Sequence, residues 1–311
     1  MRVPFTGVGT ALVTPFTASG ALDEPAVRRL ARRQIDAGVH VLVPCGTTGE
    51  APTLSMDERC RSVEIVAEEA AGRALVLAGA GGYDTSEVIH AAAEMARCGA
   101  DGVLSVTPYY NRPTPEGLFE HYKAIAESTA LPIVLYNVPG RTGCNLDPAT
   151  VVRLAGIPNI VGVKEASGNI TQMAEICRAV PDDFIVLSGD DAITLPLMAL
   201  GGRGVISVVS NEVPSEMVQL VEAAERGDFA AARRWHEKLL PLMQVNFIES
   251  SPGPVKFAMA AMGLCEEVYR LPMVSPRRAS QTRILSTMRA FGLPVVAGSA
   301  VEQGAASGVE G

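Results

Sequence analysis

Cysteine and histidine are scarce in this chain and badly spaced for binding a metal. Of its 311 residues only six are cysteine and four are histidine. No two cysteines form a CxxC pair, and no two histidines have the i, i+4 spacing that places two imidazoles on one helix face. We therefore expect neither a zinc site nor a disulfide framework, and the sequence does not favour a metal-dependent mechanism.

Long apolar runs and blocks of like charge are also missing. No stretch approaches the roughly 18 uninterrupted apolar residues that a membrane span requires, and the first residues lack the apolar segment of a signal peptide. The net charge of -8, from 26 Lys and Arg against 34 Asp and Glu, is spread along the chain. This pattern argues against nucleic acid or an anionic membrane as a partner, and we expect a soluble, cytoplasmic protein.

What the chain does contain is a regular alternation of strand-like and helix-like segments. Hydrophobic residues make up 48% of it, enough for a large buried core. Eight short β-branched runs, each followed by a helix-period segment, begin near Val8, Val39, Leu75, Gly102, Ile133, Ile160, Phe184 and Gly204. Such alternation predicts a parallel sheet with right-handed crossovers, and eight units can close it into a (β/α)8 TIM barrel. A doubly wound open sheet is the alternative fold.

The helical segments and the end of the chain complete the predicted organisation. Helices of the eight units begin near Glu24, Met56, Ser86, Pro115, Pro148, Asn169, Asp191 and Pro214. Beyond them, helical patterns cover residues 228–249, 254–263 and 276–291. We therefore predict a barrel over residues 1–226, a C-terminal helical appendage over 227–292, and a disordered tail over 293–311, where few apolar residues offset the ordering entropy.

One glycine-rich stretch could suggest a dinucleotide cofactor. Gly79, Gly81 and Gly82 follow a predicted strand, but Asp84 stands where the dinucleotide-binding fingerprint has its last glycine. A tight turn between strand and helix is the better interpretation, and we expect no bound cofactor.

Polar residues gather at the ends of five predicted strands. In a parallel barrel the catalytic groups lie at the carboxyl ends of the strands, on one rim. The polar ends here are residues 45–50, 107–111, 136–143, 164–168 and 188–191. Their convergence predicts an active site on this rim, and it is a more specific signal than any one motif.

Lys164 is the most informative single residue, because it closes an apolar run and would point into the barrel mouth. A desolvated lysine loses proton affinity and becomes an amine nucleophile toward a carbonyl. Tyr136, Thr47 and Tyr110 stand at three other strand ends, and their hydroxyls could pass protons during imine formation. The alternatives are a lysine whose head reaches water, a turn threonine, and tyrosines on the rim with solvated tips.

Arg141 follows the fifth predicted strand and offers a fixed guanidinium fork. Such a fork suits a substrate carboxylate, because it can donate two parallel hydrogen bonds. A surface ion pair is the alternative role for this residue.

Three motifs together resemble the dihydrodipicolinate synthase/N-acetylneuraminate lyase family. The motifs are Gly46-Thr47-Thr48-Gly49-Glu50, Tyr136-Asn137-Val138-Pro139 and Gly162-Val163-Lys164-Glu165-Ala166, and the resemblance covers about residues 3–292. Residues 109–113, 141–143, 188–191 and 254–256 are similar to the synthase branch of the family.

The resemblance implies a homotetramer of barrels in which Lys164 forms a Schiff base with pyruvate and condenses it with L-aspartate 4-semialdehyde. Thr48, Gly189 and the backbone at Ile206 would hold pyruvate, and Arg141 would bind the aldehyde's carboxylate. Tyr136, Thr47 and Tyr110 would relay protons, Tyr110 from the neighbouring subunit. No cofactor is implied, since the imine itself is the electron sink.

Two other functions stay open on the sequence. A related Schiff-base aldolase could act on a 2-keto acid such as N-acetylneuraminate or 4-hydroxy-2-oxoglutarate, since Lys164 and Tyr136 would serve either reaction. The chain could also be a non-catalytic barrel that senses a keto acid. Arg141 favours the synthase over the aldolase, and the three relay hydroxyls argue against the sensor.

The resemblance also bears on regulation by L-lysine. In the lysine-sensitive pattern two histidines stand where this chain has Met56 and Arg59, and an asparagine stands where it has Tyr83. Arg59 would repel an ammonium group, although Glu87 and Tyr109 match the pattern. These residues could equally be ordinary surface or interface positions. In both cases we expect weak inhibition by L-lysine or none.

Overall fold

A computed structural model describes residues 5–296, in which eight parallel strands close into a barrel in chain order. The strands are β1 Gly7–Ala11, β2 Val41–Val43, β3 Leu75–Gly79, β4 Gly102–Val106, β5 Ile133–Asn137, β6 Ile160–Glu165, β7 Ile185–Ser188 and β8 Gly204–Ser207. β8 pairs with β1, which closes the ring. The predicted barrel is confirmed, and the open sheet is excluded.

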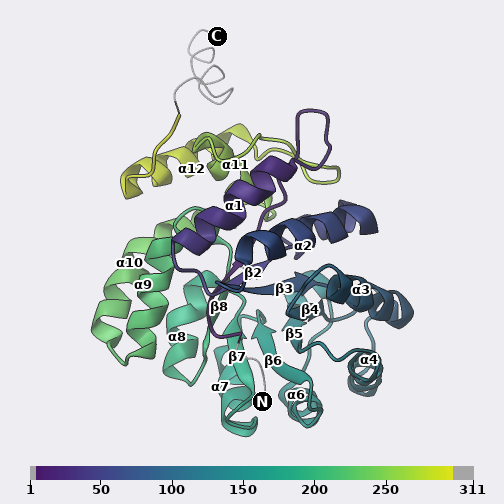
Figure 1. Cartoon of the computed structure of the whole chain (residues 1–311). Coiled ribbons are helices and arrows are strands. Elements are labelled where there is room, and N and C mark those ends of the chain that lie inside the picture. Colours follow the sequence, from purple (N-terminus) through teal and green to yellow (C-terminus); the bar gives the residue numbers. More distant parts are fainter. Residues whose placement is uncertain (1–4, 297–311) are drawn as a thin grey trace.

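Helices surround the barrel, each following a strand (Figure 1). They are α1 Glu24–Asp36, α2 Met56–Ala70, α3 Thr85–Arg97, α4 Pro115–Ser128, α5 Pro139–Thr142, α6 Pro148–Ala155, α7 Ile170–Ala179, α8 Thr194–Ala199 and α9 Pro214–Glu225, with short 3-10 turns η1 Ala51–Thr53, η2 Asp191–Ile193 and η3 Val209–Asn211. The predicted helix starts agree to within a few residues. α5, a single turn after β5, was not predicted.

Side-chain caps explain why the helices begin where they do. Ser55 accepts from the backbone N–H of Glu58, whose carboxylate accepts from the backbone N–H of Ser55 in return, so α2 starts with a capping box. Asp84 and Asp147 cap α3 and α6 with their carboxylates, which accept from backbone N–H groups of the first turn. Local sequence alone is enough to specify these boundaries.

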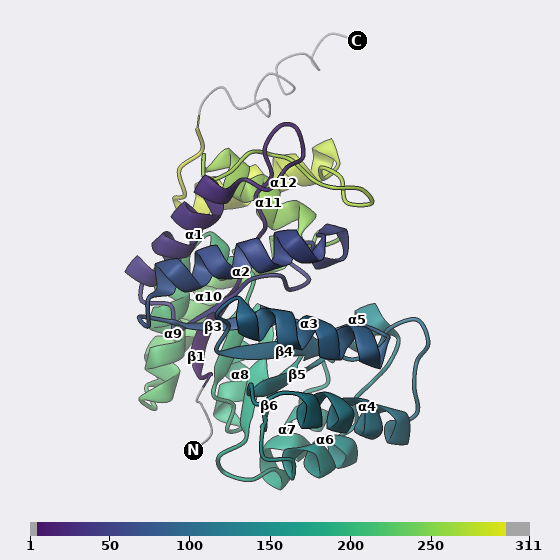
Figure 2. The same cartoon turned by 45° about the vertical axis from the view of Figure 1, so that its right-hand side comes forward.

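The C-terminal region is helical, as predicted, and consists of α10 Phe229–Val245, α11 Gly253–Ala261 and α12 Arg278–Phe291. α10 packs against α9 and α12, and α11 packs against α12 and contacts η3. In Figures 1 and 2, α11 and α12 lie beside α1 at one end of the molecule.

The predicted tail begins at residue 293, but its first residues are bound to the appendage. The backbone N–H of Leu293 donates to Met288, and that of Val296 donates to Ala261. Leu293 and Val295 also pack against the main hydrophobic core. The remainder of the predicted tail, 297–311, lies outside the described residues.

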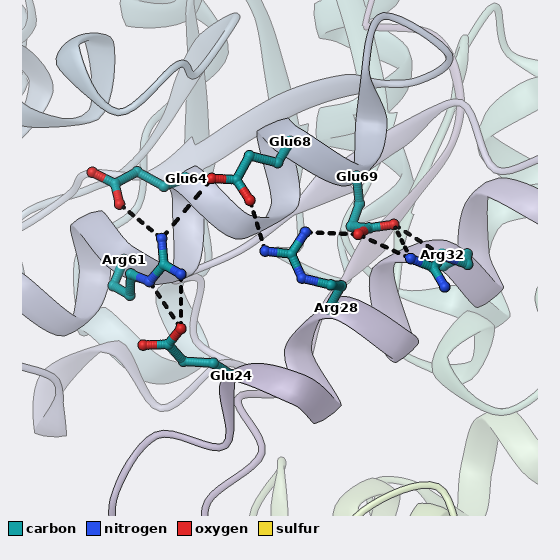
Figure 3. A network of polar contacts seen from close by, with 7 residues as sticks. All are labelled: Glu24, Arg28, Arg32, Arg61, Glu64, Glu68 and Glu69. Carbon is teal, nitrogen blue, oxygen red and sulfur yellow. Dashed lines mark hydrogen bonds and ion pairs between the residues drawn. The ribbon is translucent and has the colours of Figure 1, made fainter.

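Arginine and glutamate side chains join α1 to α2 on the surface. Figure 3 shows this network, which comprises Glu24, Arg28, Arg32, Arg61, Glu64, Glu68 and Glu69. Each exposed pair contributes little to stability, because solvent screens it, although Glu69 is largely buried and receives hydrogen bonds from two arginines. The network fastens two barrel helices and contains no residue of the candidate site.

Within residues 5–296, no helix is long and apolar enough to cross a membrane. The same residues contain no group of three or more histidine, cysteine or acidic side chains that could hold a metal ion.

Candidate active site

The register of two neighbouring strands places Tyr136 beside Lys164. Tyr136 on β5 is the direct partner of Lys164 on β6. Both side chains point into the barrel, since residues directly opposite one another on paired strands share a face. The Nζ of Lys164 lies 4.1 Å from the centre of the Tyr136 ring. The pairing therefore supplies the amine with an aromatic neighbour that carries a hydroxyl.

A glycine on the next strand end makes room for the stem of Lys164. A Cβ added to Gly189 would lie 2.6 Å from the Cβ of Ala166 and 3.0 Å from the Cε of Lys164. Even alanine would therefore have to displace the lysine stem. Gly189, which the resemblance assigns to pyruvate binding, also keeps the path of Lys164 open.

Lys164 has no carboxylate partner within residues 5–296, although Glu165 is the next residue. Side chains alternate along a strand, so Glu165 points to the outer face of the barrel. There its carboxylate accepts from Asn137 Nδ2, Gln172 Nε2 and the backbone N–H of Ser167. The acid beside Lys164 is therefore fully engaged elsewhere. Lys164 is 5% exposed, and within the described part of the chain its amine has no fixed counter-ion.

The loop after β2, residues 45–50, adopts a strained backbone that carries Thr47 and Thr48. Cys45 and Glu50 have φ of 57° and 53°, the left-handed region that residues other than glycine rarely occupy. The loop is pressed against β3, since a Cβ on Gly79 would stand 2.0 Å from the carbonyl oxygen of Cys45. Close packing thus stabilises a backbone conformation that residues other than glycine do not favour on their own.

Glu50 anchors this loop through a buried ion pair that the sequence reasoning missed. Its Oε1 accepts from the Nζ of Lys256 at 2.6 Å, and both side chains are almost fully buried. Its Oε2 accepts from the backbone N–H of Arg270 at 3.2 Å. Burial lowers the pKa of Lys256, and the charge of Glu50 opposes that shift. Local sequence patterns could not predict this pair, because its two residues are 206 positions apart in the chain.

Two adjoining cavities open at the barrel mouth. The amine lobe, of about 140 Å³, is lined by Thr47, Thr48, Tyr136, Val138, Arg141, Lys164, Ala166, Gly189, Asp190, Val208, Phe247 and Ser251. The outer lobe, of about 280 Å³, is lined by Cys45, Gly46, Thr47, Ala51, Pro52, Arg59, Gly79, Gly81, Leu104, Val106, Tyr109, Tyr136, Val138, Arg141 and Thr142. Thr47, Tyr136, Val138 and Arg141 belong to both.

Arg141 stands where the two lobes meet. It lies in α5, is exposed, and donates from Nη2 to the backbone carbonyl of Ser251 at 3.4 Å. This single long contact leaves its other N–H groups available to a ligand. A carboxylate placed between the lobes would be within its reach.

Six of the eight predicted site residues line the amine lobe: Lys164, Tyr136, Thr47, Thr48, Arg141 and Gly189. Ile206 is buried in the barrel interior in one apolar cluster with Tyr136, and it does not line either lobe. Tyr110 lines neither lobe, is 90% exposed and has φ of 69°. A single chain therefore brings together the predicted amine, the arginine predicted to bind a carboxylate, and two of the three residues predicted to bind pyruvate, but not Tyr110.

Phe247 and Ser251 line the amine lobe but were not predicted. They follow α10, in the appendage, whereas the sequence argument considered only the strand ends of the barrel. Arg59 and Tyr109 line the outer lobe, although the sequence argument counted neither among the site residues. Helical periodicity predicts α10 but does not say which end of the barrel it reaches.

Comparison with known proteins agrees with the resemblance seen in the motifs. A model of the dihydrodipicolinate synthetase family matches residues 4–290. A protein of Koribacter versatilis, named 4-hydroxy-tetrahydrodipicolinate synthase, is 51% identical over 279 residues, which cover 89% of this chain and 93% of that protein. A protein of the same name from Syntrophus aciditrophicus is 50% identical and covers 93% of this chain and 99% of its own.

Solved structures show the same fold. Dihydrodipicolinate synthase from Aquifex aeolicus superposes with a TM-score of 0.92 at 42% identity, covering 94% of this chain and 99% of that one. A structure described as the first monomeric dihydrodipicolinate synthase variant superposes with a TM-score of 0.91 at 44% identity, covering 93% and 97%.

Proposed function

The chain belongs to the dihydrodipicolinate synthetase family, and we propose that it condenses pyruvate with L-aspartate 4-semialdehyde through an imine on Lys164. The product would be 4-hydroxy-tetrahydrodipicolinate, a precursor for lysine and diaminopimelate biosynthesis. The observation that carries the proposal is a buried, unpaired lysine that faces a cavity beside a tyrosine. The names of the relatives favour this substrate pair.

Imine formation is the first step of the proposed reaction. The neutral amine of Lys164 attacks the keto carbon of pyruvate, and the resulting carbinolamine loses its hydroxyl as water. A proton must leave the nitrogen and another must reach the departing oxygen. Tyr136 and Thr47 both line the amine lobe, so their hydroxyls are assigned this transfer. Tyr110 is the third member that the resemblance implies.

Pyruvate binding is assigned to the floor of the amine lobe. Thr48 and Gly189 line it beside Lys164 and would bind the pyruvate carboxylate. The backbone at Ile206, which lies outside the lining of the lobe, is assigned to pyruvate by the resemblance alone. The lobe, at about 140 Å³, is small, which suits a three-carbon acid.

Condensation follows once the imine gives a methyl proton to the proposed relay of Tyr136 and Thr47 and becomes an enamine. The enamine carbon attacks the aldehyde carbon of L-aspartate 4-semialdehyde, and the aldehyde oxygen takes that proton and becomes a hydroxyl. The carboxylate of this substrate would be bound by Arg141 at the junction of the lobes. The amino group of the substrate then displaces the amine of Lys164, which closes the ring and frees the enzyme.

The assembled enzyme is proposed to be a homotetramer in which Tyr110 of one subunit completes the relay of its neighbour. The exposure of Tyr110 in a single chain supports this, since an isolated subunit leaves a large aromatic ring in water. The similar structure described as a monomeric variant makes the oligomeric state a matter for measurement. The cytoplasmic location stays a prediction.

An assay panel tests the function. Purified protein with pyruvate should consume L-aspartate 4-semialdehyde, and it should cleave N-acetylneuraminate and 4-hydroxy-2-oxoglutarate far more slowly or not at all. Faster turnover of either keto acid would replace the synthase with an aldolase. Pyruvate binding without turnover of any of them would favour a sensor, for which no contact described above gives specific support.

A further inference from the structure

A buried acid and a buried amide meet where η3 approaches the C-terminal end of α10, one residue before Phe247 of the amine-lobe lining. Glu212 follows η3, and Asn246 caps the C-terminal end of α10. The Nδ2 of Asn246 donates to the Oε2 of Glu212 at 2.6 Å. Their side chains are almost fully buried, and the contact joins the barrel to the appendage.

Each of the two groups keeps one buried oxygen without a donor. Within the described residues, neither the Oε1 of Glu212 nor the Oδ1 of Asn246 has a hydrogen-bond partner. A carboxylate can only accept, so an ionised Glu212 would leave its own Oε1 and the Oδ1 of Asn246 without a donor. A carboxylic acid donates one hydrogen bond, and the amide oxygen of Asn246 is an acceptor on the group to which Glu212 is already bonded. Burying an oxygen without a hydrogen-bond donor destabilises the folded state. A proton on Glu212 would provide a donor for one of these two oxygens.

The charged groups around Glu212 act in opposite directions: the charge of Asp191 raises the pKa of Glu212, and the charge of Arg33 lowers it. Arg33 on α1 is the nearby cation, but it donates to two backbone carbonyls, one of them Glu212's own. Glu216 on α9 also acts on Arg33, and Asp191 on η2 is a second buried acid near Glu212. Lys256 on α11 is paired with Glu50. No cation within residues 5–296 pairs with the carboxyl group of Glu212.

We propose that Glu212 is a protonated carboxylic acid in the folded protein, that it donates to Asn246, and that this acid–amide pair positions the segment 246–251 against the amine lobe. Burial raises the pKa of Glu212 to about 8, with the charge of Asp191 acting in the same direction and the hydrogen bond from Asn246 and the charge of Arg33 opposing it. Glu212 is thus a positioning residue that acts through its neighbours.

The connection to the site runs along the chain. Phe247 directly follows Asn246 and lines the amine lobe, and Ser251 lines it too and accepts from Arg141. On the other side of the pair, Val208 at the end of β8 lines the same lobe. Loss of the acid–amide pair would release α10 from η3 and allow this wall to move relative to Lys164.

A raised pKa gives the pair a definite pH dependence. The unfolded chain loses the Glu212 proton near the ordinary value of 4.5, and the folded chain retains it up to about 8. The free energy of unfolding from this group therefore falls as pH rises from about 4.5 to about 8, then stays constant. Above that range the pair lacks its donor and the wall loosens.

Glu212→Gln tests the proposal, because a glutamine amide donates and accepts as the neutral acid does but does not titrate. Wild type at pH 7 should show the infrared C=O stretch of a buried carboxylic acid, and the variant should lack it. The melting temperature of wild type should fall relative to that of Glu212→Gln between pH 5 and 8.5, by several degrees. Glu225→Gln, on an exposed glutamate of α9, is the control and should follow wild type.

The kinetic readout rests on the proposed function, whereas the infrared and melting readouts do not. In wild type the KM for the aldehyde should rise above pH 8, as the pair loses its proton. Glu212→Gln should have the wild-type KM at pH 7 and should not show this rise. Glu212→Ala should raise that KM several-fold at every pH while still trapping pyruvate on Lys164. The protonated state would be overturned if the melting temperatures of wild type and Glu212→Gln changed with pH in the same way, or if wild type lacked the infrared band of a buried carboxylic acid. Equal damage in the Gln and Ala variants would overturn the positioning role.

Discussion

Two lysines are buried in this molecule, and their surroundings are opposite. Lys164 faces an open lobe, has a tyrosine ring 4.1 Å from its Nζ, and has no carboxylate partner within the described residues. Lys256 is fully buried, bonded to Glu50 at 2.6 Å, with its Nζ 4.2 Å from the centre of the Phe16 ring. Burial alone therefore does not separate the proposed nucleophile from the other buried lysine. An accessible cavity and the absence of a fixed counter-ion within residues 5–296 distinguish the proposed nucleophile from the structural cation.

The comparison also separates two functions of polar groups in one barrel. The pair of Lys256 and Glu50 holds the strained loop that carries Thr47 and Thr48, so it acts on the site from behind. Lys164 touches the space where substrate would lie. Variants of the first region should change stability, and variants of the second should change chemistry.

The largest expected effect is on chemistry. Lys164→Arg keeps a cation but cannot form the imine, so kcat should fall by a factor on the order of 10³ or more. The circular dichroism spectrum and melting temperature should stay near those of wild type. Activity within tenfold of wild type would mean that Lys164 is not the nucleophile.

The next effect is on stability. Lys256→Met leaves Glu50 buried without its partner, which should cost about 3–5 kcal/mol in the free energy of unfolding. Denaturant titration measures this loss. Combining it with Glu50→Gln should recover much of it, because the unpaired charge is then gone. If Lys256→Met unfolded as wild type does, the proposed structural role of this pair would be wrong.

Arg141→Ala tests the junction between the lobes. Loss of a charge-assisted contact to a carboxylate costs about 1.5–3 kcal/mol, so the KM for the aldehyde should rise by roughly 10- to 100-fold. The KM for pyruvate and trapping on Lys164 should change little. Arg153→Ala, which removes a surface pair with Glu116, is the matched control. Equal losses for both substrates would instead assign Arg141 to the whole site.

A smaller effect concerns acid. Hydrogen bonds from Arg270 hold the pKa of Glu58 at about 2, below its ordinary 4.5. The stabilisation from this depressed pKa is present above 4.5 and is lost as pH falls toward 2. Glu58→Gln should therefore flatten the fall in melting temperature between pH 4.5 and 2, whereas Glu120→Gln on the surface should not. If the melting temperatures of wild type and Glu58→Gln fell equally between pH 4.5 and 2, Glu58 would not contribute to the loss of stability in acid.

The smallest effect expected is that of L-lysine. Arg59 and Tyr109 line the outer lobe, and Tyr83 packs edge-on against Tyr109 with ring centres 5.1 Å apart. A cation and a filled space oppose an ammonium ligand there. Initial rates at saturating pyruvate should be nearly unchanged by millimolar L-lysine. Strong cooperative inhibition would show that these positions were wrongly equated with the lysine-sensitive pattern.

Local signals were enough to predict most of the fold and most of the residues that line the amine lobe. Alternating strands and helices specified the barrel, and the position of Lys164 at the end of an apolar strand predicted that its amine faces the barrel mouth, where it lines the amine lobe. Contacts between distant residues could not be predicted in this way. The bond from Lys256 to Glu50 and that from Asn246 to Glu212 depend on how the appendage packs on the barrel, which periodicity does not encode. Phe247 was missed for the same reason.

The most direct test of the difference between the two lysines is chemical trapping. Protein incubated with pyruvate is reduced with borohydride, and the modified peptide is located by mass spectrometry. We predict one adduct per chain, on Lys164, with loss of activity in proportion to labelling and with Lys256 unmodified. An adduct on Lys256, or none at all, would contradict the conclusion that access and a missing counter-ion make Lys164 the nucleophile.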